Sequence, residues 1–191
     1  MEPDIHWAKY WLRACLLKQR AALSTSERVR RSAAIVRALQ NTREFKKAKT
    51  VALYISFGSE VSTLKIIDLC FRQNKTVLLP KTDLGFHRPY FVVHVKNEKL
   101  KKTSHGPREV AVAKKPFAGP IDLVIVPGVG FDPQGRRLGF GGGVYDRLLR
   151  RLRAPRIGLF FDLQQLHRVP TNSRDASLDR ILTESRSIPV S

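Results

Sequence analysis

Six short runs rich in β-branched and aromatic residues, interleaved with helical patterns, constrain the fold of this chain more than any other feature. The clearest is IDLVIVPG at residues 121–128, whose apolar core is closed by Pro127 and Gly128. Strands that alternate with helices predict an α/β fold, in which a mostly parallel sheet is covered by helices on both faces. The six predicted strands lie at residues 50–56, 76–80, 89–95, 121–128, 156–161 and 181–185.

Helical patterns fill the stretches before and between these strands. Over residues 7–22 the apolar residues Trp7, Tyr10, Trp11 and Ala14 recur at helical spacing, which predicts an amphipathic helix. Ser24 and Glu27 form the pattern of a capping box, so a second helix should begin there. Two more helices are predicted, over residues 62–71 and after the glycines at 139–143; residues 96–119 read as a surface loop. The second helix should bury a stripe made of Val29, Ala33, Val36 and Leu39, and the last one carries Tyr145, Leu148, Leu149 and Leu152 at helical spacing.

Length and composition limit the class of protein. With 191 residues and no internal repeat, the chain is expected to form one domain over residues 1–191 and to act as a monomer. It has no apolar stretch long enough to span a bilayer and no signal-peptide pattern, so we expect a cytoplasmic protein without a membrane partner. Cys15 and Cys70 form no CxxC pair and are expected to be reduced core residues.

The net charge is unusual. Lys and Arg number 35 against 16 Asp and Glu, which gives a formal net charge of +19. Such a field attracts anions, including nucleotides and nucleic acid. A basic nucleic-acid-binding module therefore remains an alternative, with Arg147, Arg150, Arg151, Arg153 and Arg156 as its candidate cluster; no aromatic residues interleave with these arginines in a stacking pattern.

The stretch RLGFGGGVYD at residues 137–146 is the candidate phosphate site. It lacks the lysine of a P-loop and the final glycine of a dinucleotide fingerprint. Glycines nevertheless allow the backbone N–H groups to approach a bulky anion, and Arg137 adds a cation beside them. Asp146 fits a ligand of Mg²⁺. The alternatives are a tight turn that requires positive φ, and a carboxylate at a helix start.

Ordered motifs along nearly the whole chain resemble the 5-formyltetrahydrofolate cyclo-ligase family. The stretch FDPQGRRLGFGGGVYDRLL resembles the family signature, and Lys9 with Arg13 is similar to the KxxxR of its first helix. YISFGSEVST, DLVIVPGVGFD and LQQLHRVPTNSRDASLDRILTE resemble three further blocks. The resemblance implies a ligase of folate and one-carbon metabolism that uses ATP and Mg²⁺. Its substrate, 5-formyltetrahydrofolate, can carry a polyglutamate tail, and its product is 5,10-methenyltetrahydrofolate.

The resemblance also implies roles for particular residues. Tyr145, which would orient the reacting groups, and Arg137 are the expected catalytic residues. Asp146 and Asp175 are the expected Mg²⁺ ligands. The expected ATP-binding residues are Lys9, Arg13, Arg137, Leu138, Gly139, Phe140, Gly141, Gly142, Gly143, Val144 and Tyr145. The expected substrate-binding residues are Arg13, Ile55, Glu60, Phe140, Gly141, Gly142, Gly143 and Val144.

Each of these residues also has a plainer interpretation. Glu60 could be a solvated loop acid, Lys9 and Arg13 exposed helix cations, and Asp175 the cap of a turn. The chain also departs from the family pattern, with Val144 in place of a tyrosine and Val110 in place of a proline after Glu109. These departures leave open a relative that uses ATP on a different substrate.

Overall fold

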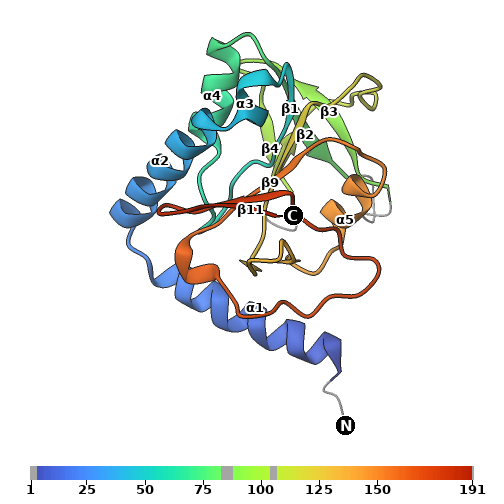
Figure 1. The fold of residues 1–191 in the computed structure, drawn as a ribbon. Helices are drawn as coiled ribbons and strands as arrows, with labels where there is room; N and C mark the ends of the chain where they lie inside the picture. Colours follow the sequence, from blue (N-terminus) through green and yellow to red (C-terminus); the bar gives the residue numbers. More distant parts are fainter. Residues whose placement is uncertain (1–3, 83–87, 104–106, 191) are drawn as a thin grey trace.

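The structure is a computed structural model that describes residues 4–82, 88–103 and 107–190. A seven-stranded sheet forms its centre, with the strand order β11-β10-β9-β6-β1-β2-β3 (Figure 1). The strands of this sheet are β1 (Thr50–Ala52), β2 (Thr76–Lys81), β3 (Tyr90–His94), β6 (Leu123–Val126), β9 (Arg156–Leu159), β10 (Arg180–Leu182) and β11 (Ser187–Pro189).

The remaining elements are helices and two small hairpins. The hairpins pair β4 (Leu100–Lys102) with β5 (Arg108–Val110), and β7 (Gly130–Phe131) with β8 (Arg137–Leu138). The helices are α1 (Ile5–Ala22), α2 (Thr25–Asn41), α3 (Arg43–Lys47), α4 (Leu64–Arg72), α5 (Val144–Leu149) and the 3-10 turn η1 (Asp162–Gln164).

The central sheet is mostly parallel, as the sequence predicted. The five strands from β10 to β2 in the sheet order pair in parallel, and only the edge strands β3 and β11 pair antiparallel. Each of the six predicted strands overlaps an observed one. The sequence missed the short β11 and both hairpins, because strands of two or three residues are too short to show a period.

Helices cover both faces of the sheet. Side chains alternate along each strand, so Val51 faces one side and Ala52 the other. On the first side the helices α2, α3 and α4 pack on the sheet, for example through Leu39, Phe45 and Ile66. On the second side α5 packs through Leu148 and Leu149.

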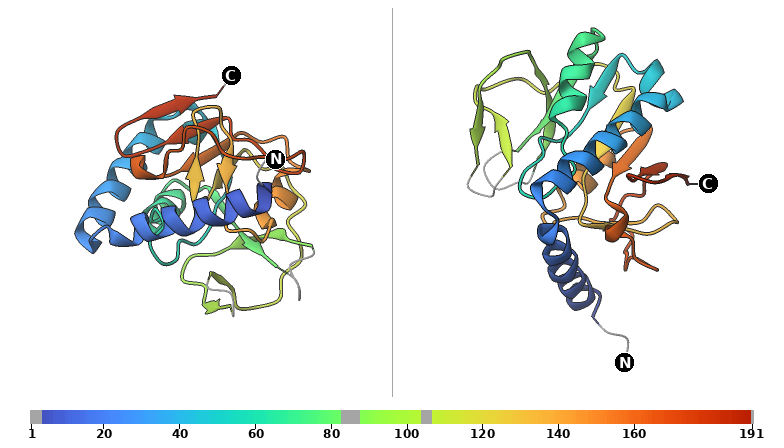
Figure 2. Two further views of the ribbon diagram at one scale, coloured as in Figure 1. Left: turned by 90° about the horizontal axis from the view of Figure 1, so that it is seen from below. Right: turned by 90° about the vertical axis from the view of Figure 1, so that its left-hand side faces the viewer.

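The order of connection reverses between β1 and β6. From β1 the chain continues to β2 on one side, whereas β6 continues to β9 and β10 on the other. In open α/β sheets, ligands bind in the crevice outside the carboxyl ends of the strands at such a point. Helix α1 crosses this end of the molecule (Figures 1 and 2), where Leu16 packs with Val129, Leu138 and Val169.

The N-terminal helices confirm the predicted boundaries but not every predicted face. The Ser24–Glu27 capping box is present, and Val36 and Leu39 of α2 are buried. Val29, predicted in the same stripe, is 56% exposed. The apolar stripe of α1 also faces solvent, because its opposite face carries Leu16 and Arg20 into the molecule.

Three further expectations need correction. Helix α5 ends at Leu149, so Leu152 of the predicted stripe lies outside it. Residues 96–119 are not only surface loop: β5 lies among them, and Val110 is fully buried. Cys70 is buried as expected, but Cys15 is exposed on α1.

Candidate active site

A cavity of about 840 Å³ lies at the carboxyl end of the sheet, between α1, the glycine stretch and the segment around Asp175. Every residue that the resemblance assigned to catalysis or to binding ATP, substrate or Mg²⁺ lines it. From α1 come Lys9 and Arg13, from the segment after β1 come Ile55 and Glu60, and from the last loop comes Asp175. The glycine stretch contributes all ten residues: Arg137, Leu138, Gly139, Phe140, Gly141, Gly142, Gly143, Val144, Tyr145 and Asp146.

The glycine stretch forms a tight loop that runs into α5. Gly141 and Gly143 have φ values of +107° and +62°, a conformation that favours glycine. Two arginines hold the loop by its carbonyl oxygens. Arg13 Nε donates to Gly139 O at 2.7 Å, and Arg147 Nη2 donates to Gly142 O at 2.8 Å. The turn requires positive φ, as one interpretation held, and it also faces the cavity as a phosphate cradle would.

The two predicted metal ligands each form an ion pair. Asp146 Oδ1 accepts a hydrogen bond from Arg137 Nη2 at 2.7 Å and another from the backbone N–H of Ala176 at 3.1 Å. Asp175 Oδ2 lies 2.5 Å from Lys9 Nζ. The described residues hold no cluster of three or more His, Cys, Asp or Glu that could bind a metal without help.

Arg137 is a deeply buried cation of the site. Its side chain is 2% exposed, and besides Asp146 it donates to the carbonyl oxygen of Ala176 through Nη1. Its Nε is buried without a hydrogen-bond partner among the described residues. Buried hydrogen-bond donors are normally paired with an acceptor. The described residues supply no acceptor for this nitrogen.

Glu60 is a buried acid on the cavity wall, not a solvated one. Only 7% of the residue is exposed, and its Oε2 accepts the backbone N–H of Phe57 at 3.0 Å. Burial raises the pKa of Glu60 to about 7, although the Phe57 N–H and the charge of Arg20 both favour the ionised form. Arg20 is itself held by Ser59 Oγ at 3.0 Å and Gly128 O at 3.2 Å.

Two tyrosines lie on the same side of the cavity. The hydroxyl of Tyr54 donates to Val61 O at 3.0 Å, so it is satisfied by the fold. The hydroxyl of Tyr145 is buried and has no partner among the described residues. Burial raises the pKa of both phenols, and the nearby Glu60 raises them further, so both stay protonated at neutral pH. Tyr145 thus carries a neutral donor that a bound ligand can use.

Aromatic residues form an apolar part of the wall. The rings of Phe57 and Phe140 lie 5.3 Å apart, and the guanidinium of Arg20 lies 5.6 Å from the Phe140 ring. Phe140 remains 42% exposed and lines the cavity. A planar heterocycle fits against such a surface.

Sequence analysis missed several residues of this site. Arg20 belongs to none of the quoted motifs, and Tyr54 and Phe57 lie in the YISFGSEVST block but were given no role. Their side chains reach the cavity region because α1 and the segment after β1 meet there. Glu109 also lines the cavity and accepts hydrogen bonds from the backbone and hydroxyl of Thr82 at 3.1 and 2.5 Å. The sequence marked Glu109 only as the residue before Val110, in a departure from the family pattern, and gave it no role in the site.

Comparison with known proteins decides the family. The model of the 5-formyltetrahydrofolate cyclo-ligase family matches residues 6–184. The chain belongs to the 5-formyltetrahydrofolate cyclo-ligase family. It is 31% identical to the mouse 5-formyltetrahydrofolate cyclo-ligase, with 94% of this chain and 95% of that protein covered. It is 32% identical to the Haemophilus influenzae enzyme, with 90% and 95% covered.

A solved structure shows the same fold. The 5,10-methenyltetrahydrofolate synthetase of Aquifex aeolicus superposes with a TM-score of 0.83 at 33% identity, over 95% of this chain and 92% of that one. The chain is thus an enzyme of the cyclo-ligase family, as the resemblance of its motifs implied. Of the arginines considered for nucleic-acid binding, Arg147 and Arg156 donate to backbone carbonyls around α5, so they help to hold the fold.

Proposed function

We propose that the cavity binds ATP and 5-formyltetrahydrofolate side by side and joins phosphoryl transfer to ring closure, yielding 5,10-methenyltetrahydrofolate, ADP and phosphate. The formyl oxygen attacks the γ-phosphorus, and ADP leaves. The nitrogen N10 then forms a bond to the activated carbon and loses its proton, while phosphate departs with the electrons of the C–O bond. The observation that carries this proposal is that the cationic loop and the apolar, acid-bearing wall line one cavity.

The loop side of the cavity is suited to the phosphates. Arg13 and Arg137 lie at the glycines, and Lys9 reaches the same space from α1. Cations and glycine N–H groups neutralise and orient phosphate oxygens without a covalent nucleophile. The orphaned Nε of Arg137 gives this cation an unused donor, which supports its assignment to the reacting phosphate.

The residues present also fit Mg²⁺. Asp146 and Asp175 offer the hard carboxylate oxygens that this ion prefers, and one or two such ligands together with phosphate and water complete its shell. When bound, the ion would offset negative charge on the phosphates. Both carboxylates are paired with cations, so Arg137 and Lys9 would share them with the metal.

The part of the cavity wall around Glu60, Phe140 and Tyr145 is suited to the folate. Glu60 can accept the N–H donors of a pterin ring, Phe140 can pack on its face, and the unpartnered hydroxyl of Tyr145 can donate to the reacting group. Val144 lines the cavity without a ring or hydroxyl, so folate contacts at that edge are made by its neighbours.

No helix of the described residues is long and apolar enough to cross a membrane. We also propose that the enzyme is monomeric and cytoplasmic.

The test is an absorbance assay for the methenyl product with purified protein, 5-formyltetrahydrofolate, ATP and Mg²⁺. Product should form only when ATP is present and should be lost in Asp146→Ala. Asp122→Ala is a control because Asp122 lies at the start of β6 and binds the backbone of Lys49 and Thr50 instead of the cavity. Bound ATP without product would point to another substrate, and absence of ATP binding would contradict the assignment of the loop.

A further inference from the structure

The outer face of α1 exposes three aromatic rings to solvent. Trp7, Tyr10 and Trp11 are 60%, 59% and 60% exposed, and their rings contact one another edge to face with centroids 5.9 and 5.8 Å apart. Ala14 and Cys15 continue the exposed stripe by one turn, and Lys18 follows. Contiguous exposed aromatic residues of this kind mark interaction surfaces in folded proteins.

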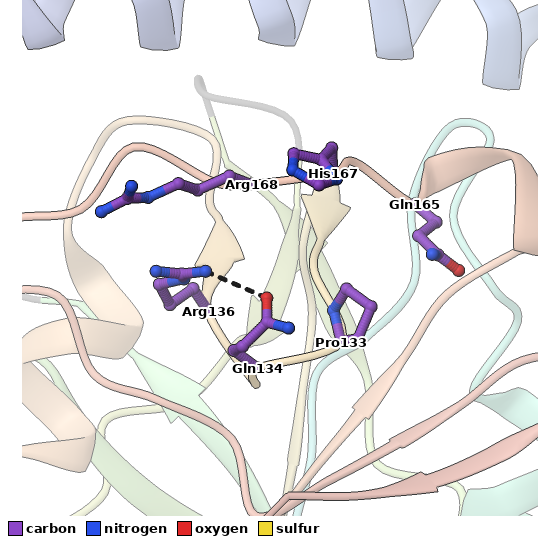
Figure 3. A pocket seen from close by; sticks show the side chains of 6 residues that line it. All are labelled: Pro133, Gln134, Arg136, Gln165, His167 and Arg168. Carbon is purple, nitrogen blue, oxygen red and sulfur yellow. Dashed lines mark hydrogen bonds between the residues drawn. The ribbon is translucent and has the colours of Figure 1, made fainter.

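A basic pocket lies beside this helix. It has a volume of about 340 Å³ and is lined by Pro133, Gln134, Arg136, Gln165, His167 and Arg168 (Figure 3). None of the described residues that line it is acidic, and Arg136 is held in place by the buried Asp132 at 2.7 Å. The pocket is separate from the catalytic cavity, with which it shares no lining residue.

The helix and the pocket belong to one surface. The segment that carries His167 and Arg168 runs alongside α1, as Figures 1 and 2 show, and is held there by Leu166 and Val169, which pack with Leu16 of α1. This packing leaves His167 and Arg168 exposed beside α1. We call the stripe and the pocket together the α1 face.

The charge of the protein and the shape of the α1 face indicate which kind of partner this face binds. A second copy of the chain would bring together two bodies of formal net charge +19, which repel each other. Helix α1 projects from the rest of the fold as a ridge (Figure 2, right), so a partner has to accept a convex aromatic edge. Tryptophan and tyrosine favour the boundary between water and lipid, where the ring is in apolar surroundings and the N–H or O–H stays wet.

We propose that the α1 face docks on the surface of an anionic phospholipid bilayer. Trp7, Tyr10 and Trp11 enter the headgroup boundary, while Arg136, His167 and Arg168 receive lipid phosphates. The association is peripheral, like that of an amphipathic helix lying in the plane of the interface. It does not depend on the catalytic activity, and it gives part of the charge excess a role that one ATP and one folate do not explain.

Intrinsic fluorescence tests this directly, because both tryptophans of the chain, Trp7 and Trp11, lie on the α1 face. We expect vesicles of phosphatidylcholine with 30% phosphatidylglycerol to shift the emission to shorter wavelength and to co-sediment the protein. Vesicles of pure phosphatidylcholine should do neither, and inorganic phosphate alone should leave the emission unchanged. Lack of both a shift and sedimentation with anionic vesicles would overturn the proposal.

Matched variants distinguish vesicle binding through this face from general electrostatic attraction to anionic vesicles. Trp7→Ala keeps Trp11 as the reporter, and Arg168→Glu reverses one charge at the pocket; each should weaken vesicle binding at least about fivefold. Arg72→Glu makes the same charge change on α4, at the opposite end of the molecule (Figure 1), and should have less than about a twofold effect. Equal losses in Arg168→Glu and Arg72→Glu, or a lipid-independent dimer that Trp7→Ala abolishes, would refute docking by this face.

Discussion

Glu60 is the residue whose ionisation the fold changes most usefully, because burial raises its pKa to about 7. Between the pKa of the unfolded chain and this value, the folded protein keeps a proton that the unfolded chain has lost. The free energy of unfolding therefore falls as pH rises through this window. We expect this group to remove about 2.5 kcal/mol between pH 5 and pH 8.

Glu60→Gln tests that dependence, since glutamine keeps the shape and cannot ionise. Urea unfolding of both proteins at pH 5 and pH 8 measures it, and the informative quantity is the difference between the two pH slopes. The variant should lack the contribution of about 2.5 kcal/mol, whatever its absolute stability. Parallel pH profiles of the two proteins would show that Glu60 titrates normally.

Removing the single hydroxyl oxygen of Tyr145 tests its role in catalysis separately from its effect on stability. Its hydroxyl is buried without a partner, so Tyr145→Phe should leave the free energy of unfolding unchanged or slightly higher. If the hydroxyl donates to the reacting group, kcat should fall about tenfold or more. Tyr54→Phe is the matched control: it loses the bond to Val61 O and should cost about 1 kcal/mol of stability. Full activity of Tyr145→Phe would remove this residue from the mechanism.

At the scale of the element, the glycine loop needs glycine at two positions for two different reasons. Gly143 has a φ of +62°, and a Cβ there would lie 2.9 Å from Arg147 Nη1. A Cβ at Gly139 would meet no atom within 4 Å, and that residue is not in the left-handed region. Strain therefore explains the glycine at 143, whereas only a bound ligand would explain the one at 139.

The pair of alanine variants distinguishes these requirements. Gly143→Ala should lower the free energy of unfolding by about 1 to 2 kcal/mol, because the turn is strained. Gly139→Ala should leave it within about 0.5 kcal/mol and raise the KM for ATP. Thermal unfolding and ATP titration of both variants provide the readouts. An unchanged KM for ATP in Gly139→Ala would contradict close approach of phosphate at this position.

Helix α1 shows how one element serves two surfaces. Lys9, Arg13 and Arg20 extend from it toward the cavity and its surroundings, while Trp7 and Trp11 face outward. The helical spacing of these residues was legible in the sequence. The sequence did not predict which side of the helix packs inward, because both Leu16 and the aromatic stripe are apolar. Which of them is buried depends on what the rest of the chain places opposite the helix.

At the scale of the whole molecule, self-repulsion from the charge of +19 opposes folding. Surface ion pairs contribute little, with a median below about 1 kcal/mol, so screening should weaken the repulsion more than it weakens them. We expect Tm to rise by several degrees between low salt and about 0.3 M NaCl. Differential scanning calorimetry measures this, with sucrose at matched osmolality as the uncharged control. A Tm that falls with NaCl would show that ion pairs dominate.

Local patterns in the sequence determined the strands, the capping box of α2 and the glycine loop, because β-branched runs, Ser24 with Glu27, and clustered glycines act over a few residues. Resemblance of its motifs added the family and the residues of the site. Only the tertiary structure decided that Glu60 is buried and shifted, that Asp146 and Asp175 are paired with Arg137 and Lys9, and that the tryptophans face water. These features depend on segments far apart in the chain, and spacing along a sequence carries no information about which distant residue will lie opposite.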